Sequence, residues 1–149
     1  MKIICIGRNY ADHAKEMKSA VPTEPLYFLK PDTAILREGD FYYPNFTKDL
    51  HFECELIVKI DRVGKHIDKS FAHKYYSEFS LGIDFTARDI QEHCKANGLP
   101  WEKAKGFDSS AAISNQWINK ADLDLETAEF TFFQNNELKQ TGHPRDFIF

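Results

Sequence analysis

The sequence predicts an α+β protein that is mostly β. Hydrophobic residues make up 42% of the 149 residues, which is enough for a packed core. Aromatic residues make up 14%, with 13 Phe, and this content favours strands over a coiled coil. Short strand-like segments outnumber the helical ones along the chain, so we expect few helices, at the periphery. The length matches one domain, predicted over residues 1–149.

Charge and cysteine usage exclude several classes of protein. With 19 basic and 23 acidic residues the net charge is 19 − 23 = −4, which disfavours a nucleic-acid partner because phosphate binding needs a basic excess. Cys5, Cys54 and Cys94 form no CxxC pair, which excludes a zinc ribbon and a thioredoxin-like site. The apolar run over residues 3–6 is too short for a signal peptide or a membrane span. We therefore expect a soluble, cytoplasmic protein.

The first segments are predicted as a short buried strand over residues 2–6, a helix over 10–17 and a strand over 26–29. Spacing of i, i+3 places His13 and Glu16 on one face of that helix. A glutamate can hold an imidazole in one tautomer, so these two residues could form a base and its orienter. An ordinary surface pair is the alternative.

The clearest pattern in the chain is a strand over residues 51–60, in which apolar side chains alternate with Glu53, Glu55 and Lys59. Two carboxylates on one strand face repel each other unless a cation lies between them. Such oxygen ligands suit Mg²⁺, Mn²⁺ or Ca²⁺, and the alternative is a solvated strand face. Asp84, near the end of a strand over residues 79–85, could supply a third oxygen ligand.

Further elements follow from local signals. We expect a helix over residues 69–78, and a second helix that opens at a Thr86–Asp89 capping box and ends at Gly98. Arg88 and Gln91 share a face of that second helix and could reach a substrate carboxylate; an exposed helix face is the alternative.

The remaining segments are predicted as a loop over 101–107, a weak strand over 111–114 and a hairpin. Lys105, in the loop, could pair with an anionic ligand or could simply be solvated. The hairpin pairs residues 129–134 with 137–141 through a two-residue turn at Asn135 and Asn136, because Asn tolerates positive φ.

Five segments together resemble the fumarylacetoacetate hydrolase family, in particular its short acylpyruvate hydrolase or oxaloacetate decarboxylase-like branch. The matching strings occur in the family's order and spacing and cover most of the chain. They are IGRNYADHAKE (6–16), PLYFLKP (25–31), HFECE (51–55), GIDFTARDIQ (82–91) and LPWEKAKGFD (99–108).

The resemblance implies a mixed β-roll that holds Mg²⁺ or Mn²⁺ and assembles as a homodimer. The implied metal ligands are Glu53, Glu55 and Asp84, and His13 with Glu16 would activate water. Substrate contacts would come from Arg88, Gln91 and Lys105, of which Lys105 would also help to hold or protonate the departing fragment.

The implied activity is that of a metal-dependent hydrolase or lyase. It would cleave a carbon–carbon bond of a short β-diketo or 2-oxo acid, by acylpyruvate hydrolysis or oxaloacetate decarboxylation, through a metal-stabilised enolate. The alternatives are an isomerase or hydratase of 2-hydroxy-dienoate acids in aromatic catabolism, or a catalytically silent metal-binding domain.

The resemblance also implies that chains of this family continue beyond Phe149 into further strands and a Gly- and Thr-containing substrate loop. We therefore expect the last strands of the roll and part of the pocket wall to be missing from these 149 residues. Unpaired strand edges recruit other chains, so self-association is expected.

Overall fold

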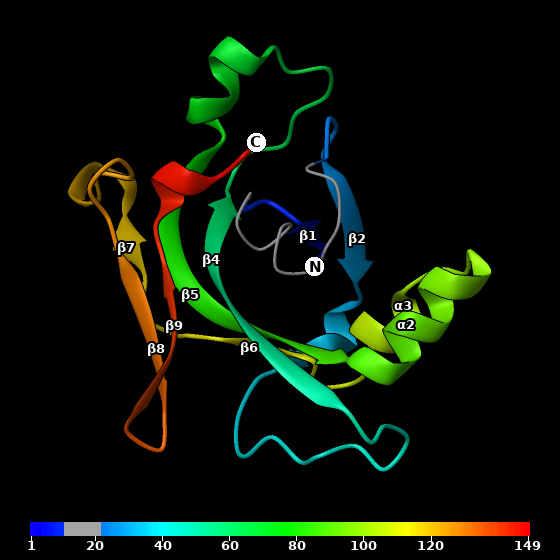
Figure 1. Ribbon diagram of the computed structural model, residues 1–149. Coiled ribbons are helices and arrows are strands. Elements are labelled where there is room, and N and C mark those ends of the chain that lie inside the picture. The colour runs from blue at the N-terminus through cyan, green and yellow to red at the C-terminus, as the bar shows by residue number, and fades with distance from the viewer. Residues whose placement is uncertain (11–21) are drawn as a thin grey trace. The chain divides into compact units, whose positions relative to one another are not determined.

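The computed structural model describes residues 1–10 and 22–149, and the predicted helix over 10–17, with His13 and Glu16, lies almost wholly outside them. The described residues are mostly β with few helices, as the sequence predicts (Figure 1). The strands are β1 (Ile3–Gly7), β2 (Leu26–Lys30), β3 (Ile35–Leu36), β4 (Leu50–Ile60), β5 (Tyr76–Ala87), β6 (Ala111–Ile113), β7 (Ile118–Asn119), β8 (Phe130–Gln134) and β9 (Glu137–Gly142). The helices are α2 (Arg88–Asn97) and α3 (Glu102–Lys105), with 3-10 turns at Asp32–Ala34, Lys69–Lys74, Lys120–Asp122 and Pro144–Asp146. None of these helices is long and apolar enough to span a membrane.

The strands of the described residues form three sheets. β1 pairs with β2 and β8 pairs with β9, both antiparallel. The largest sheet has the order β3-β6-β5-β4, with β7 also paired to β5. β3 and β6 run parallel whereas β5 and β7 run antiparallel, so this sheet is mixed. Backbone bonds from Arg88 to Asp49 and from Asp61 to Tyr75 close the two ends of the β4–β5 pair.

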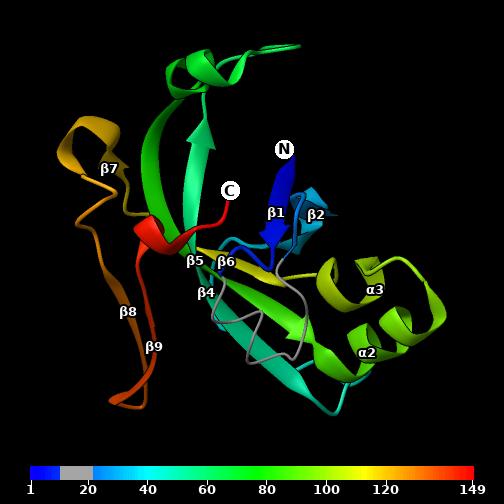
Figure 2. The same ribbon diagram turned by 45° about the horizontal axis from the view of Figure 1, so that its top comes forward.

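The described chain divides into two compact units. Unit 1 comprises Met1–Glu53, Ile83–Ala112 and Asp146–Phe149, and unit 2 comprises Cys54–Gly82 and Ile113–Arg145. In unit 1, α2 packs on α3 and α3 packs on β2, beyond the end of β5 (Figure 2). Most of the buried polar side chains also belong to unit 1. Its interior is therefore a polar network rather than a purely apolar core.

Unit 2 contains the predicted hairpin, and its turn has the predicted chemistry. Asn135 and Asn136 both have positive φ, at 52° and 64°, as a two-residue hairpin turn requires. The register places Gly142 opposite Phe130, a residue that is 8% exposed. A Cβ on Gly142 would collide with the ring of Phe130, so a larger residue at this position requires that ring to move.

Three local predictions are wrong. The segment over 69–78 is a 3-10 turn, Lys69–Lys74, followed by the start of β5, and the predicted loop over 101–107 contains α3. The strand over 2–6 exists but is not buried, since Ile4 is 61% and Ile6 39% exposed.

The predicted capping box is also absent, because tertiary partners take both side chains. The hydroxyl of Thr86 donates to Glu53, and the carboxylate of Asp89 accepts from Thr47. Ala87 is instead the N-cap of α2, without a side-chain cap bond. The predicted end of this helix is confirmed, because Gly98 caps it at φ 62°.

We expect Gly142→Ala to destabilise the protein by about 1–3 kcal/mol, because its methyl group must displace the ring of Phe130. Urea unfolding at neutral pH measures the change. Thr141→Ala, at the exposed neighbouring position, is the control and should cost less. An unchanged midpoint for Gly142→Ala would show that the hairpin does not pack as described.

Candidate functional site

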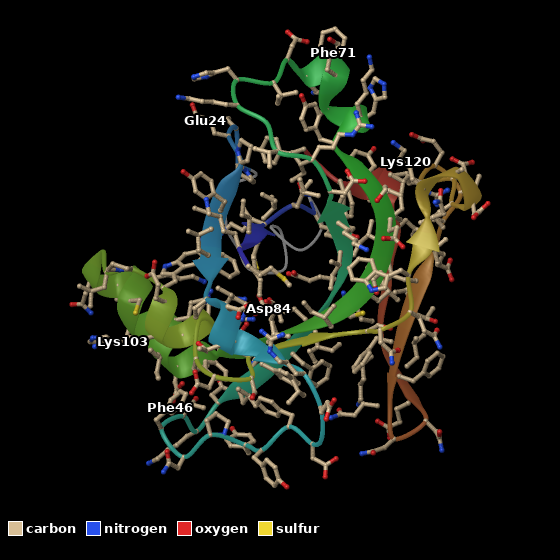
Figure 3. The ribbon with its side chains drawn as sticks, turned by 180° about the vertical axis from the view of Figure 1, so that it is seen from behind. Glu24, Phe46, Phe71, Asp84, Lys103 and Lys120 are labelled. Atoms are coloured by element: carbon tan, nitrogen blue, oxygen red, sulfur yellow. The ribbon has the colours of Figure 1, made fainter. Side chains whose placement is uncertain are left out.

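The paired strands β4 and β5 bring three carboxylates together. Glu53 and Glu55 are two residues apart on β4 and therefore share a face, and Asp84 belongs to β5. One carboxylate oxygen from each of the three residues lies within 4.8 Å of the others. Asp84 is 4% exposed and lies inside β5, which continues to Ala87. Figure 3 shows it in the interior, whereas the side chain of Lys103 points outward.

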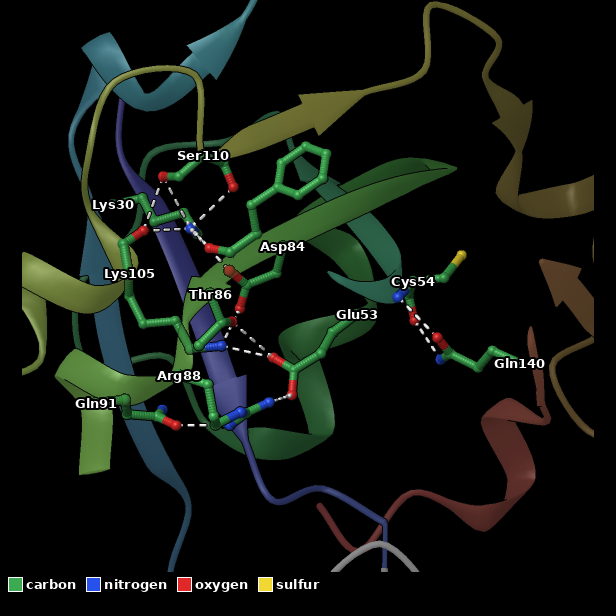
Figure 4. A network of polar contacts seen from close by, with 11 residues as sticks. Lys30, Glu53, Cys54, Asp84, Thr86, Arg88, Gln91, Lys105, Ser110 and Gln140 are labelled. Atoms are coloured by element: carbon green, nitrogen blue, oxygen red, sulfur yellow. Dashed lines mark hydrogen bonds and ion pairs between the residues drawn. The ribbon is translucent and has the colours of Figure 1, made fainter. Parts of the chain in front are cut away.

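The ammonium of Lys105 lies between two of these carboxylates. Its Nζ is 2.6 Å from Oε2 of Glu53 and 2.6 Å from Oδ2 of Asp84 (Figure 4). Lys105 is the last residue of α3 and is 3% exposed, whereas Lys103 in the same helix is exposed. The short helix therefore directs one lysine into the carboxylates and the other into solvent.

Lys30, at the end of β2, is a second buried cation of the site. Its Nζ is 2.8 Å from Oδ1 of Asp84 and donates to the backbone carbonyl of Lys105. It also lies 3.0 Å from both the carbonyl and the hydroxyl oxygen of Ser110. Lys30 thus holds one oxygen of Asp84 and the backbone of Lys105 at the same time.

Arg88 completes the network from the first turn of α2. One guanidinium nitrogen lies 3.0 Å from Oε1 of Glu53, and another donates to Oε1 of Gln91 at 2.6 Å. Thr86 donates to the second oxygen of Glu53 at 3.2 Å. Both oxygens of Glu53 therefore have partners among the described residues.

These contacts shift the ionisation of the network. Burial raises the pKa of Glu53, but the charges of Lys105 and Arg88 outweigh it and hold that pKa at about 2, against 4.5 ordinarily. Burial lowers the pKa of Lys105, but Asp84 and Glu53 outweigh it and raise that pKa above its ordinary value. Glu53 and Lys105 are therefore both charged at neutral pH.

The structure places the residues selected from the sequence as follows. It brings Glu53, Glu55, Asp84, Arg88 and Lys105 into one cluster, and Gln91 joins it through Arg88. The alternative of an exposed face for Arg88 and Gln91 is wrong, since they are 8% and 3% exposed. His13 and Glu16 lie outside the described residues.

Lys30 and Thr86 belong to the network but were not among the predicted site residues. A signal for Lys30 exists in the alternation of β2, where Leu26, Phe28 and Lys30 face inward while Tyr27 and Leu29 are exposed. A lysine on the inward face of a strand needs an anionic partner. Thr86 gave no such signal, because a threonine before a helix is ordinarily read as a cap.

The carboxylates fit a hard divalent cation. Around a six-coordinate ion with metal–oxygen bonds of about 2.1 Å, ligand oxygens lie roughly 3 to 4.2 Å apart. The oxygens of Glu53, Glu55 and Asp84 lie within 4.8 Å, so a contraction of under about 2 Å brings them into range. Because the described cluster contains no thiolate or imidazole, it favours Mg²⁺ or Mn²⁺ over a softer ion.

Fold and site together define a class: a mostly β protein whose paired strands present three carboxylates of the kind that hold a divalent cation. A family model described as "Fumarylacetoacetate (FAA) hydrolase C-terminal" matches residues 2–149. The chain belongs to the fumarylacetoacetate hydrolase family.

Named relatives of this chain are enzymes of 2-oxo acids. The chain is 40% identical over 148 residues to the mitochondrial oxaloacetate tautomerase of Bos taurus, covering 99% of this chain and 67% of the relative. It is 38% identical to the mitochondrial oxaloacetate decarboxylase of Dictyostelium discoideum, covering 99% and 69%. A crystal structure of the fumarylpyruvate hydrolase of Pseudomonas aeruginosa, in complex with Mn²⁺ and pyruvate, superposes with a TM-score of 0.89 at 30% identity, covering 99% and 66%. The chain thus spans about two thirds of the length of these relatives.

The low pKa of Glu53 predicts that the free energy of unfolding of the metal-free protein decreases at acid pH. Because the folded pKa, about 2, is below the ordinary 4.5, the stabilisation is complete above pH 4.5 and is lost as the pH falls toward 2. The side chain is 25% exposed, and the full effect is on the order of 3 kcal/mol at most. Urea unfolding between pH 6 and 2.5 measures it. In Glu53→Gln this part of the pH dependence should be absent; an identical profile would contradict the ionic network.

Lys30→Met should destabilise the protein by about 3 kcal/mol, because it removes one partner of a buried ion pair while retaining most of the volume. Lys103→Met makes the same substitution at an exposed lysine, where we expect a change within about 0.5 kcal/mol. Chemical denaturation of both variants gives the comparison. Equal stabilities would mean that Lys30 contributes nothing through its contacts with Asp84 and Lys105.

Proposed function

We propose that this chain catalyses a metal-dependent reaction of a short 2-oxo acid, with oxaloacetate or an acylpyruvate as substrate. The observation that supports it most is the cluster of Glu53, Glu55 and Asp84, with the Lys105 ammonium between two of its members. Relatives are named as an oxaloacetate tautomerase, an oxaloacetate decarboxylase and a fumarylpyruvate hydrolase, the last in complex with Mn²⁺ and pyruvate. A divalent cation that stabilises negative charge on a 2-oxo group would serve each of these reactions.

The charges of the site favour a dianionic substrate. Three carboxylates, Glu53, Glu55 and Asp84, give −3, and three cations, Lys30, Arg88 and Lys105, give +3, so the cluster sums to zero. A divalent cation adds +2, which a dicarboxylate of charge −2 neutralises. Bound there, the cation supplies Lewis-acid stabilisation of the negative charge on the 2-oxo group.

The charged residues of this chain would bind the substrate and move protons. Arg88, which is held by Gln91, and Lys105 are the cations next to the carboxylates and would orient a substrate carboxylate. Lys105, with its raised pKa, would hold a proton near the developing negative charge. His13, oriented by Glu16, would move the proton of water or of the substrate carbon; both assignments rest on the family resemblance.

Three assays distinguish the reactions on one enzyme preparation. They follow ketonisation of enol-oxaloacetate, release of pyruvate from oxaloacetate, and cleavage of an acylpyruvate, each with Mn²⁺ or Mg²⁺ and with a chelator. Free Mn²⁺ itself promotes decarboxylation, so Asp84→Asn at the same metal concentration is the control. Turnover by the wild-type chain above that control in any of the three assays supports the proposal. Metal binding without turnover supports the silent domain instead.

Glu53→Gln and Asp84→Asn should each weaken Mn²⁺ binding by at least about tenfold, because each removes a negative oxygen that a hard cation requires. Calorimetric titration measures the affinity, and circular dichroism verifies that the variants are folded. Wild-type affinity in either variant would remove that residue from the metal site.

His13→Ala should abolish turnover while Mn²⁺ and oxalate still bind, because the carboxylates hold the ion and the dyad only moves protons. Oxalate is a suitable probe since it is an inert dicarboxylate. Loss of oxalate binding together with turnover would assign His13 a binding role and contradict the dyad.

A further inference from the structure

A side-chain amide of the β8–β9 hairpin binds the backbone of β4. Oε1 of Gln140 accepts a hydrogen bond from the Cys54 N–H at 2.8 Å, and Nε2 of Gln140 donates to the Cys54 carbonyl at 2.7 Å (Figure 4). Both residues belong to unit 2. Gln140 thus engages both polar backbone groups of a single residue.

The residue that Gln140 binds is the one between two of the candidate metal ligands. Along a strand, successive side chains point to opposite faces, so Glu53 and Glu55 share the face opposite to the Cys54 side chain, which is 6% exposed. The conformation of the peptide groups on either side of Cys54 therefore determines the distance between the Cα atoms of Glu53 and Glu55, from which the two side chains extend.

Among the described strands, β4 is the last in the order β3-β6-β5-β4, and Gln140 binds its backbone there. A terminal strand presents backbone N–H and C=O groups that no further strand pairs. The two bonds from Gln140 give the backbone of Cys54 the hydrogen bonds that a neighbouring strand would otherwise supply.

The hairpin has an irregularity beside Gln140. The β8–β9 register pairs Phe132 with Gln140 but Phe133 with Leu138, so Lys139 is an extra residue on β9. An extra residue of this kind is a β-bulge, which redirects neighbouring side chains. Gln140 is half-buried next to this bulge, whereas Lys139 is exposed.

We propose that Gln140 is a positioning residue that fixes the spacing of Glu53 and Glu55 by holding both backbone groups of Cys54. The assignment rests on the proposed metal function of those glutamates. Partners that orient metal ligands without touching the metal commonly change its affinity by 10- to 100-fold when they are removed. Gln140 instead holds the backbone from which both ligand side chains extend.

The test compares Gln140→Met with Gln134→Met. Methionine has nearly the length and volume of glutamine but forms neither bond, and Gln134 is an exposed residue of the same hairpin. Gln140→Asn keeps the amide, but its side chain is one methylene too short to reach both the N–H and the carbonyl of Cys54. If Gln140→Met does not fold, the Mn²⁺ affinity of Gln140→Asn tests the proposal. Three quantities are measured on each purified chain: Mn²⁺ affinity by calorimetry, hydrogen exchange of the Cys54 amide without metal, and the metal-free Tm.

We expect Gln140→Met to bind Mn²⁺ at least about tenfold more weakly than the wild-type chain and to exchange the Cys54 amide faster. Gln140→Asn should lie between them, and Gln134→Met should match the wild-type chain. Faster exchange or a lower Tm with unchanged Mn²⁺ affinity would make Gln140 purely structural and overturn the proposal. Absence of Mn²⁺ binding by the wild-type chain would instead overturn the proposed metal function, and this role of Gln140 with it.

Discussion

Charge neutralisation in a buried network is the constraint on which the site depends. Asp84 and Lys105 are almost fully buried, and neither charge would be tolerated there alone, because removing an ion from water costs several kcal/mol. Each is retained because the other is present, together with Lys30 and Glu53. Ion pairs therefore link the end of β2, the C-terminal part of β5 and the short helix α3.

The same arrangement connects the candidate metal ligands to the cations that would bind a substrate. Lys30 holds Oδ1 of Asp84 and leaves Oδ2 directed at Lys105. Arg88 and Lys105 each contact Glu53, so an ion bound by Glu53 would compete with these two cations for its oxygens. Binding of a metal at these carboxylates would therefore release Arg88 and Lys105 from part of their contacts with Glu53.

Sequence periodicity predicted those parts of the fold that depend on local patterns. The alternation over β4 placed Glu53 and Glu55 on one face, and two consecutive asparagines predicted the hairpin turn. Thr86 was misread because a long-range contact with Glu53 takes the hydroxyl that a local cap would use. Lys30 and Gln140 were missed for a related reason: their partners lie 54 and 86 positions away in the chain, as the pairs with Asp84 and Cys54 show. The family resemblance supplied the grouping of the acidic and basic residues, which no single segment could indicate.

Whether Glu53, Glu55 and Asp84 hold a metal is decided by a crystal structure of the chain grown with Mn²⁺, with the ion located by its anomalous scattering. We expect one strong peak in bonding contact with carboxylate oxygens of Glu53, Glu55 and Asp84, through Oδ2 of Asp84, since Lys30 holds Oδ1. A saturated crystal in which the Lys105 ammonium still bridges Glu53 and Asp84, with no peak among the three carboxylates, would contradict it.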